Sequence, residues 1–316
     1  MSTSSSKSAP LYVKVAAVRQ EADTIRSYCF EALDGGDLPE FTAGAHVGII
    51  MPGRITRYYS LCNSPRDRRR YIIGVQREDE GRGGSLLVHK RLSVGKMLML
   101  HRPRNLFPLA PDGHHLLVAG GIGITPMLSM ASELEDKGQS YHLVFSARGK
   151  ASIPFLESLN KLVVQRKATI YDTSKSRPDF DRLLFSRRDD SHVYFCGPPG
   201  FMKLVRQACA HWPPGTVHSE SFSPVVANVD DSAFIVEARR SDKTFNVGPD
   251  QSILQALREN DIEVDSVCEN GTCGTCKVRY LSGSPDHRDA ILSPAEQKEH
   301  VMVCVSRSKQ LLVLDI

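Results

Sequence analysis

Apolar and polar positions alternate in short segments from residue 11 to about residue 110, and glycine or proline separates these segments. This pattern is typical of strands that bury one face, because successive side chains of a strand point to opposite sides of the sheet. We therefore expect an antiparallel β-barrel here. Its predicted strands are Tyr12–Val18, Ile25–Glu31, His46–Ile50, Arg57–Leu61, Tyr71–Val75 and Lys96–His101.

From residue 111 to residue 222, apolar strand-like runs alternate with amphipathic stretches of helical period. This alternation favours a parallel, doubly wound α/β sheet. The predicted strands are His115–Ala119, Tyr141–Ser146, Ala168–Asp172 and Ser191–Cys196. The predicted helices run from about Met127 to Lys137, around Ile153–Gln165 and around Gly200–Ala210.

A third region begins after residues 223–231, a segment with Pro224 and Asn228 that we interpret as a linker. Residues 232–316 show a pattern that predicts an α+β domain of β-grasp type. The expected elements are a hairpin of Phe234–Arg239 and Thr244–Val247, a helix at Ile253–Asn260, the segment Met302–Val305 and a closing strand at Leu311–Leu314. The chain is thus predicted to be multidomain.

Three cysteines of the last region, Cys268, Cys273 and Cys276, are spaced C-x4-C-x2-C, and Cys304 follows them. This is the plant-type spacing for the ligands of a [2Fe-2S] cluster. Gly271 lets the loop curl closely around inorganic sulfide. The alternatives are buried or disulfide-bonded cysteines, or a zinc site, which usually shows two Cys-x-x-Cys pairs or histidines. The spacing favours the cluster.

A glycine-rich segment precedes a predicted helix at Leu86–Leu92 and consists of Gly81, Arg82, Gly83, Gly84 and Ser85. Glycines before a helix N-terminus expose N–H groups and the positive end of the helix dipole to a phosphate. Arg82 and Ser85 would complete this anion cradle. The alternative is a flexible loop in which Ser85 caps the helix.

A second glycine-rich turn lies between a predicted strand and a predicted helix and contains Gly120, Gly121, Gly123, Thr125 and Pro126. Strand, glycine turn and helix form a nucleotide-binding arrangement. Because Pro126 stands where the dinucleotide fingerprint has its third glycine, a plain Rossmann dehydrogenase is disfavoured. The last predicted strand ends in Cys196, Gly197 and Pro198, which should line the ligand crevice or else form only a tight turn.

Composition narrows the class of protein. The chain has 316 residues and a formal net charge of +4, and no apolar run approaches the roughly 20 residues that span a bilayer. We expect a soluble protein with no nucleic-acid or membrane partner. The other cysteines are scattered and no secretory signal precedes them, which favours a reducing compartment. Met1–Ala9 is expected to be a disordered tail, and the basic cluster Arg66–Arg70 a solvated turn or, alternatively, a docking site.

Nearly the whole chain resembles the flavin-dependent reductases of ferredoxin-NADP reductase type, and among them the phthalate dioxygenase reductase family. The resemblance rests on Arg57-Tyr58-Tyr59-Ser60, the two glycine turns, Cys196–Gly200 and the terminal cysteines. It implies an FMN-binding barrel at residues 1–110, an NAD-binding domain at 111–222 and a plant-type ferredoxin domain at 232–316. The order of these domains resembles the FMN branch, and the double glycine of residues 81–85 fits a terminal phosphate.

The resemblance also implies roles for single residues. Arg57 and Ser85 would hold the FMN phosphate, Tyr59 would pack on the isoalloxazine, and Ser60 would hydrogen-bond near its N5. On a regular strand, however, Tyr59 and Ser60 point to opposite faces. Thr125, Cys196 and Gly197 would place the nicotinamide. Phe222 resembles the aromatic residue that covers the flavin or leads into the linker, although it could equally serve interdomain packing.

The choice between NADH and NADPH depends on the end of the second predicted strand of the α/β sheet. Ser146, Arg148 and Lys150 stand there, and cationic groups could clamp a 2′-phosphate. No acidic residue in that stretch could bind the ribose hydroxyls. The family resemblance nevertheless favours NADH.

The implied function follows from electron counting. NADH gives two electrons as hydride, a [2Fe-2S] cluster accepts one, and a flavin can convert between them. The expected route runs from NADH through FMN and the cluster to the Rieske-type oxygenase of an aromatic-ring dioxygenase or demethylase system in the cytoplasm. A plant-type cluster near about −400 mV can reduce a Rieske centre at about −150 mV or above. Residues 269–272, expected to be exposed, are the candidate docking edge.

Two other functions remain open. A stand-alone NAD(P)H-dependent flavin reductase or oxidase would pass electrons to oxygen or a quinone. A redox sensor or pure electron carrier would bind the cluster without any flavin, and the flavin content of the purified protein separates it from the reductases.

Overall fold

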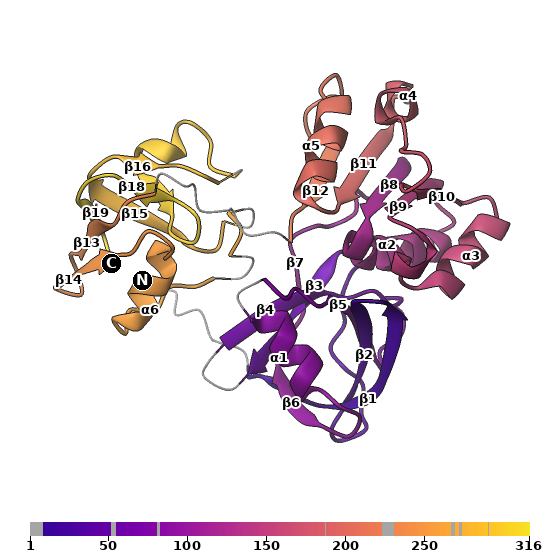
Figure 1. Cartoon of the computed structure of the whole chain (residues 1–316), viewed down its shortest axis with the longest axis horizontal. Helices are drawn as coiled ribbons and strands as arrows, with labels where there is room; N and C mark the ends of the chain where they lie inside the picture. The colour runs from indigo at the N-terminus through magenta and orange to yellow at the C-terminus, as the bar shows by residue number, and fades with distance from the viewer. Residues whose placement is uncertain are drawn as a thin grey trace. The chain divides into compact units, whose positions relative to one another are not determined.

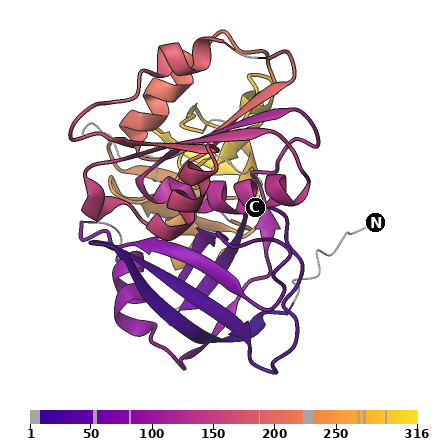
Figure 2. The same cartoon turned by 90° about the vertical axis from the view of Figure 1, so that its right-hand side faces the viewer.

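The computed structural model describes residues 9–51, 55–80, 83–186, 188–222, 231–266, 269–271, 274–289 and 291–316. The chain forms two compact units, Met1–Glu220 and Ser221–Ile316. Figures 1 and 2 show the strands and helices of each unit. The predicted N-terminal tail and linker lie almost wholly outside the described residues. Among the helices of the described residues, none is long and apolar enough to cross a membrane.

The first unit begins with an antiparallel sheet in the order β4-β3-β6-β1-β2-β5, with β7 paired to β3. Its elements are β1 (Leu11–Ala22), β2 (Ile25–Ala32), β3 (Ala45–Met51), β4 (Ile55–Ser60), β5 (Tyr71–Gln76), α1 (Gly84–Arg91), β6 (Met97–Leu100) and β7 (Arg104–Asn105). The two ends of the sheet meet where Leu61 pairs with Ile73, which closes a barrel. All six predicted strands are confirmed.

The second half of this unit is a fully parallel sheet in the order β10-β9-β8-β11-β12. Its elements are β8 (His114–Gly120), η2 (Gly121–Gly123), α2 (Ile124–Asp136), β9 (Tyr141–Ala147), η3 (Lys150–Ser152), α3 (Leu156–Val164), β10 (Ala168–Asp172), α4 (Phe180–Phe185), β11 (Ser191–Cys196), α5 (Pro199–Ala208) and β12 (Val217–Glu220). The doubly wound sheet is confirmed. Helices α2 and α3 pack on one face, and α4 and α5 pack on the other.

One helix boundary was predicted wrongly. Helix α2 begins at Ile124 rather than at Met127, so Thr125 and Pro126 lie in its first turn. Proline is tolerated there because the N–H that it lacks has no acceptor within the helix at that position. The turn before α2 is therefore shorter than the sequence suggested.

The barrel, which has a core of its own, also contributes buried residues to the core on one face of the parallel sheet. Ala43, Cys62 and Phe107 from the barrel side pack in the same buried cluster as α2 and the strands of the parallel sheet. Strand β5 comes especially close at Gly74, where an added Cβ would lie 2.8 Å from Cγ2 of Thr125. The close approach requires a residue without a side chain.

The second unit contains a sheet in the order β14-β13-β19-β15-β17 and a short pair, β16-β18. Its elements are β13 (Phe234–Ala238), β14 (Lys243–Val247), α6 (Ile253–Glu259), β15 (Lys277–Ser282), β16 (Pro285–Asp286), η4 (Glu296–Lys298), β17 (His300–Met302), β18 (Arg307–Ser308) and β19 (Leu312–Leu314). A capping box between Ser252 and Gln255 begins α6. The α+β class is confirmed, and Cys304 lies in a turn after β17.

Histidines lie side by side near the start of strands in the parallel sheet. The rings of His115 and His192 are 6.0 Å apart, and Nδ1 of His192 is 3.1 Å from Nε2 of His218. Tyr194 stacks on His218 with ring centroids 4.4 Å apart. Burial lowers the pKa of His115, and burial together with the neighbouring His192 lowers the pKa of His218 to about 4. His115 and His218 are therefore neutral in the folded protein at neutral pH.

We expect the protein to lose stability as the pH falls from about 6.5 to about 4. The pKa of His218 is about 6.5 when the chain is unfolded and about 4 when it is folded. The unfolded chain binds more protons in this range, so stability is present above it and is lost on acidification. Allowing for partial exposure, His218 alone should lower the free energy of unfolding by about 1 kcal/mol between pH 7 and pH 5.

Urea unfolding at the two pH values measures this change. The variant His218→Gln should show a smaller pH dependence than the wild-type protein. Equal pH dependence of the two proteins would contradict the assignment to this histidine.

Candidate functional site

Arg57 and the start of α1 form a positively charged corner of the barrel. Gly84 is the first residue of α1 and packs so closely on Arg57 that an added Cβ would lie 2.3 Å from Nε. Gly83, before the helix, has a positive φ of 74°, which favours glycine. Ser85 Oγ accepts a hydrogen bond from the N–H of Glu78 at 3.0 Å, which leaves its hydroxyl proton able to be donated. These groups fit an anion such as a phosphate.

Strand β4 presents its aromatic residues on two faces, as the alternation predicts. Tyr58 lies over Gly48 of β3, where an added Cβ would be 2.7 Å from the ring, and its ring is edge-on to His46 at 5.5 Å. Tyr59 packs on the other face against the barrel core, where burial raises the pKa of its phenol. Tyr59 thus faces the same side as the buried residue Leu61.

Ser60 links the barrel to the parallel sheet. Its hydroxyl donates a hydrogen bond to Oε2 of Glu220 at 3.1 Å. Glu220 is the last residue of β12 and pairs in register with Cys196 at the end of β11. The structure therefore brings Ser60 and Cys196, two predicted catalytic residues, to either side of one carboxylate.

The two glycine turns of the parallel sheet touch each other. A Cβ on Gly123 would lie 2.2 Å from the carbonyl oxygen of Cys196, and a Cβ on Gly197 would lie 3.1 Å from Cα of Gly120. Pro198 caps the start of α5 beside this contact. The loops form a cradle of bare backbone at the carboxyl edge of the sheet, which is where nucleotides bind in folds of this class.

Thr125 and Cys196 are both buried and uncharged. Thr125 Oγ1 donates to the carbonyl of Ile122 at 3.0 Å, and its methyl group faces Gly74. Burial, and next the carboxylate of Glu220, raise the pKa of Cys196 well above that of a free thiol. Cys196 is therefore a neutral thiol and not a thiolate nucleophile.

The ends of β9 and β10 form the next part of this edge. Ser146 is buried, and among the described residues its hydroxyl has no hydrogen-bond partner. Arg148 follows it and is exposed. Asp172, at the end of the neighbouring strand β10, accepts hydrogen bonds from the N–H of Gly149 at 2.9 Å and from the hydroxyl of Ser174 at 2.6 Å. The bonds from Ser174 lower the pKa of Asp172, so it is charged at neutral pH.

Asp172 and Glu220 were missed by the sequence analysis. The stretch after β9 contains no acidic residue that could bind the ribose hydroxyls. Asp172 reaches this edge from the adjacent parallel strand β10. Because Asp172 is the last residue of a predicted strand, its place at the carboxyl edge of the sheet could have been inferred from the sequence. Glu220 lies on β12, whose sequence Val-His-Ser-Glu has too few apolar residues to indicate a strand.

In the second unit, Cys276 and Cys304 are buried cysteines, 1% and 7% exposed. The N–H of Val303 donates to the carbonyl of Cys276 at 3.3 Å, which joins the two segments that carry these cysteines. Gly271 and Gly274 have positive φ angles of 71° and 77°. A buried cysteine at the end of a tightly curled loop and a second one on the segment joined to it fit an iron–sulfur cluster.

The expectation of an exposed docking edge at residues 269–271 was wrong. The side chain of Glu269 is only 14% exposed and pairs with Arg258 at 2.8 Å. Asn270 donates to the carbonyl of Ser221 at 2.9 Å, and Gly271 is buried. The arginines of the basic cluster are also paired, for example Arg66 with Asp136, as expected of a solvated turn.

Some predicted site residues are not tested by this geometry. Gly81, Arg82, Thr272, Cys268 and Cys273 lie outside the described residues. Phe222 belongs to the second unit and is 37% exposed. Their roles stay predictions.

Comparison with known protein families identifies one domain in each unit. Residues 117–207 match the oxidoreductase NAD-binding domain, and residues 236–309 match the 2Fe-2S iron-sulfur cluster binding domain. The chain is 40% identical to phthalate dioxygenase reductase of Burkholderia cepacia over 97% of each chain. It is also 40% identical to the heme-dependent oxidative N-demethylase beta subunit of Ectopseudomonas mendocina (strain ymp), over 94% of this chain and 96% of the relative.

A solved structure of phthalate dioxygenase reductase covers 98% of both chains with a TM-score of 0.83 and 39% identity. Its description names a modular structure for electron transfer from pyridine nucleotides to [2Fe-2S]. The present chain has the same succession of antiparallel sheet, parallel sheet and cluster domain. It therefore belongs to the phthalate dioxygenase reductase family, and is an oxidoreductase that uses NADH, FMN and a [2Fe-2S] cluster to deliver electrons to an oxygenase.

Proposed function

We propose that the oxygenase served by this reductase is of Rieske type and acts on an aromatic compound. The observation that carries this proposal is the full-length similarity to phthalate dioxygenase reductase. The energetics agree, because a plant-type cluster at about −400 mV can reduce a Rieske centre at about −150 mV or above. The NADH-to-cluster route does not depend on this choice of partner.

The geometry supports a division of roles within the first unit. Arg57, Gly84 and Ser85 would hold the phosphate of FMN, with Gly81, Arg82 and Gly83 completing the loop. Tyr59 would pack on the flavin and Ser60 would hydrogen-bond near its N5. Bound FMN accepts a hydride and releases single electrons. Glu220 orients the Ser60 hydroxyl, because its Oε2 accepts that proton in a hydrogen bond.

The glycine turns would hold NADH at the carboxyl edge of the parallel sheet. Gly120, Gly121 and Gly123 leave backbone N–H groups open to its phosphates, and Thr125 and Cys196 would contact the nicotinamide. The neutral Cys196 thiol adds no charge that would oppose hydride transfer. The cluster would be held by four cysteines, Cys268, Cys273, Cys276 and Cys304. The proposed domains are the FMN-binding barrel at residues 1–110, the NAD-binding domain at 111–222 and the ferredoxin domain at 232–316, with a linker at 223–231.

A second type of acceptor is favoured by one specific observation. The Ectopseudomonas relative is the beta subunit of a heme-dependent demethylase and is as similar to this chain as the phthalate dioxygenase reductase is. The cluster could therefore serve a haem oxygenase instead. Measuring electron transfer to each type of acceptor decides between them.

We expect the NADH-reduced protein to reduce a Rieske centre. Under anaerobic conditions, the reduced protein is mixed in a stopped-flow instrument with the oxygenase component of a phthalate dioxygenase, and the Rieske absorbance is followed. The variant Cys304→Ser, which lacks a proposed cluster ligand, should still oxidise NADH but not reduce the acceptor. The Rieske proposal is rejected if only a haem acceptor, the partner of the oxidative N-demethylase, becomes reduced.

We expect Gly84→Ala to weaken FMN binding. The added Cβ would overlap Nε of Arg57 and push the guanidinium from its place beside α1. The dissociation constant of FMN should rise about tenfold, which corresponds to about 1.4 kcal/mol. Flavin fluorescence titration of the apoprotein measures it. Gly200→Ala is the matched control, because open space surrounds its Cβ, and unchanged FMN affinity in Gly84→Ala would reject the phosphate site.

We expect Asp172→Asn to raise activity with NADPH. The charged carboxylate at the edge of β10 would accept from ribose hydroxyls and repel a 2′-phosphate, and the amide removes that repulsion. The ratio of kcat/KM for NADH to that for NADPH should fall at least about tenfold, mainly through a lower KM for NADPH. Asp34→Asn is the control, since Asp34 makes a similar loop contact with Gly36 in the barrel. An unchanged ratio would remove Asp172 from the nucleotide site.

A further inference from the structure

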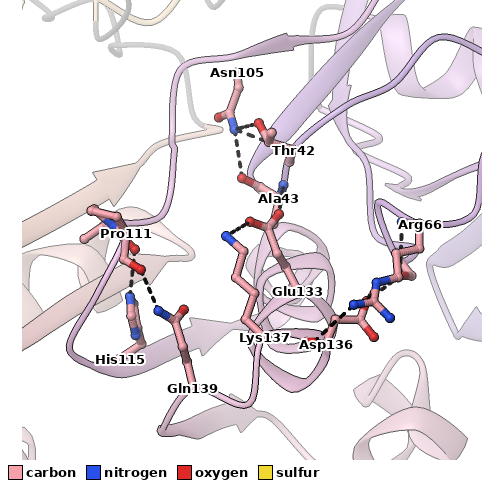
Figure 3. Close-up of polar contacts among 12 residues, drawn as sticks. Thr42, Ala43, Arg66, Asn105, Pro111, His115, Glu133, Asp136, Lys137 and Gln139 are labelled. Carbon is pink, nitrogen blue, oxygen red and sulfur yellow. Dashed lines mark hydrogen bonds and ion pairs between the residues drawn. The ribbon is translucent and has the colours of Figure 1, made fainter.

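Helix α2 connects the nucleotide loop to the barrel. Its first turn follows Gly121–Gly123 and contains Thr125, whereas its last turn contains Glu133 and Asp136. Figure 3 shows the polar side chains of this last turn directed at segments of the barrel. One helix therefore carries a residue of the proposed nucleotide site in its first turn and contacts the barrel with its last turn.

Glu133 binds the barrel backbone directly. Its Oε2 accepts a hydrogen bond from the N–H of Ala43 at 2.8 Å, and its Oε1 accepts from Nζ of Lys137 at 2.7 Å (Figure 3). The side chain of Glu133 is only 16% exposed. Asn105 donates to the carbonyl of Ala43 at 2.8 Å, so side chains hold both polar groups of this residue. Bonds to a sheltered carboxylate are stronger than bonds between neutral groups.

Asp136 adds a weaker second contact. Its Oδ2 lies 3.2 Å from Nε of Arg66 and 3.4 Å from Oγ of Ser64. The side chain of Arg66 is 71% exposed, and ion pairs of this kind contribute little. Glu133 is the dominant polar contact of the two.

These contacts lie at the two ends of the hairpin that carries the proposed flavin residues. Ala43 precedes β3 by two residues, and Ser64 follows β4 by four. Strand β4 pairs with β3 through Ser60 opposite His46 and Tyr59 opposite Val47. Helix α2 thus contacts both chain ends of the β3–β4 hairpin through its last turn, and its first turn contains Thr125.

We propose that Glu133 is a positioning residue for hydride transfer. By holding Ala43, it fixes the β3–β4 hairpin relative to the nucleotide loop, and so fixes the approach of the nicotinamide to the flavin. This inference rests on the proposed assignment of both cofactor sites. Hydride transfer needs reacting atoms about 3 to 3.5 Å apart, and a misplacement of about 1 Å can lower the rate about 100-fold.

The test compares Glu133→Ala with Glu133→Gln, Glu133→Asp and Glu135→Ala. Stopped-flow mixing with NADH gives the limiting rate of flavin reduction per bound FMN and the dissociation constant of NADH. We expect Glu133→Ala to lower the limiting rate at least tenfold, with the NADH dissociation constant changed less than twofold. Glu133→Gln should retain most of the rate because its amide oxygen can still accept from Ala43. Glu133→Asp, which is too short to reach, should be slow.

Glu135 is the matched control because its carboxylate binds Tyr141 and Lys167, both within the parallel-sheet half. Glu135→Ala should reduce at the wild-type rate. Amide hydrogen exchange supplies a readout that does not depend on turnover, and the N–H of Ala43 should exchange faster in Glu133→Ala but not in Glu135→Ala.

The inference is overturned if Glu133→Ala and Glu133→Asp both reduce at the wild-type rate per bound FMN. It is also overturned if Glu135→Ala slows reduction equally, because that result would indicate general destabilisation. Failure of the proposed FMN site gives a different result, namely unchanged FMN affinity in Gly84→Ala, so the two failures are distinguishable.

Discussion

The apolar contact between the barrel and the parallel sheet is the constraint on which the proposed active site depends. Ala43, Cys62 and Phe107 are buried in the same cluster as α2. Protein interiors are packed as tightly as organic crystals, so such a core transmits displacement and does not absorb it. Hydride transfer tolerates little variation in the separation of its reacting atoms. Packing of barrel residues into the core of the parallel sheet supplies that accuracy.

In the proposed function, the polar groups at this junction orient the cofactors and do not catalyse proton transfer. Ser60 and Thr125 contribute hydroxyls, Cys196 a neutral thiol, and Glu220 the carboxylate that receives the Ser60 hydroxyl. This set fits an enzyme whose difficult chemistry belongs to its cofactors, because the protein then needs to supply alignment and electrostatics.

The fold class and most strands of the first unit could be predicted from the sequence, because burial of one face or of both faces leaves a clear periodicity, but β12 and β15 were not predicted. The sequence also indicated the glycine turns and the cysteine loop, since each motif is local. Asp172 and Glu220 were not found because they reach the site across neighbouring strands, and sequence separation does not reveal that proximity. The start of α2 was misjudged because Pro126 was treated as part of the turn, although proline is compatible with the first turn of a helix.

Gly74 and Gly123 have an evolutionary consequence. At Gly123 the nearest atom to an added Cβ is the carbonyl oxygen of Cys196, and at Gly74 it is the side chain of Thr125. Every missense change in a glycine codon introduces a Cβ, so even the smallest replacement, alanine, would force the two glycine turns apart or lift β5 away from α2. These codons can accept silent changes only, unless the surrounding backbone moves as well. New substrates and partners for this reductase are therefore expected to evolve through positions other than these two glycines.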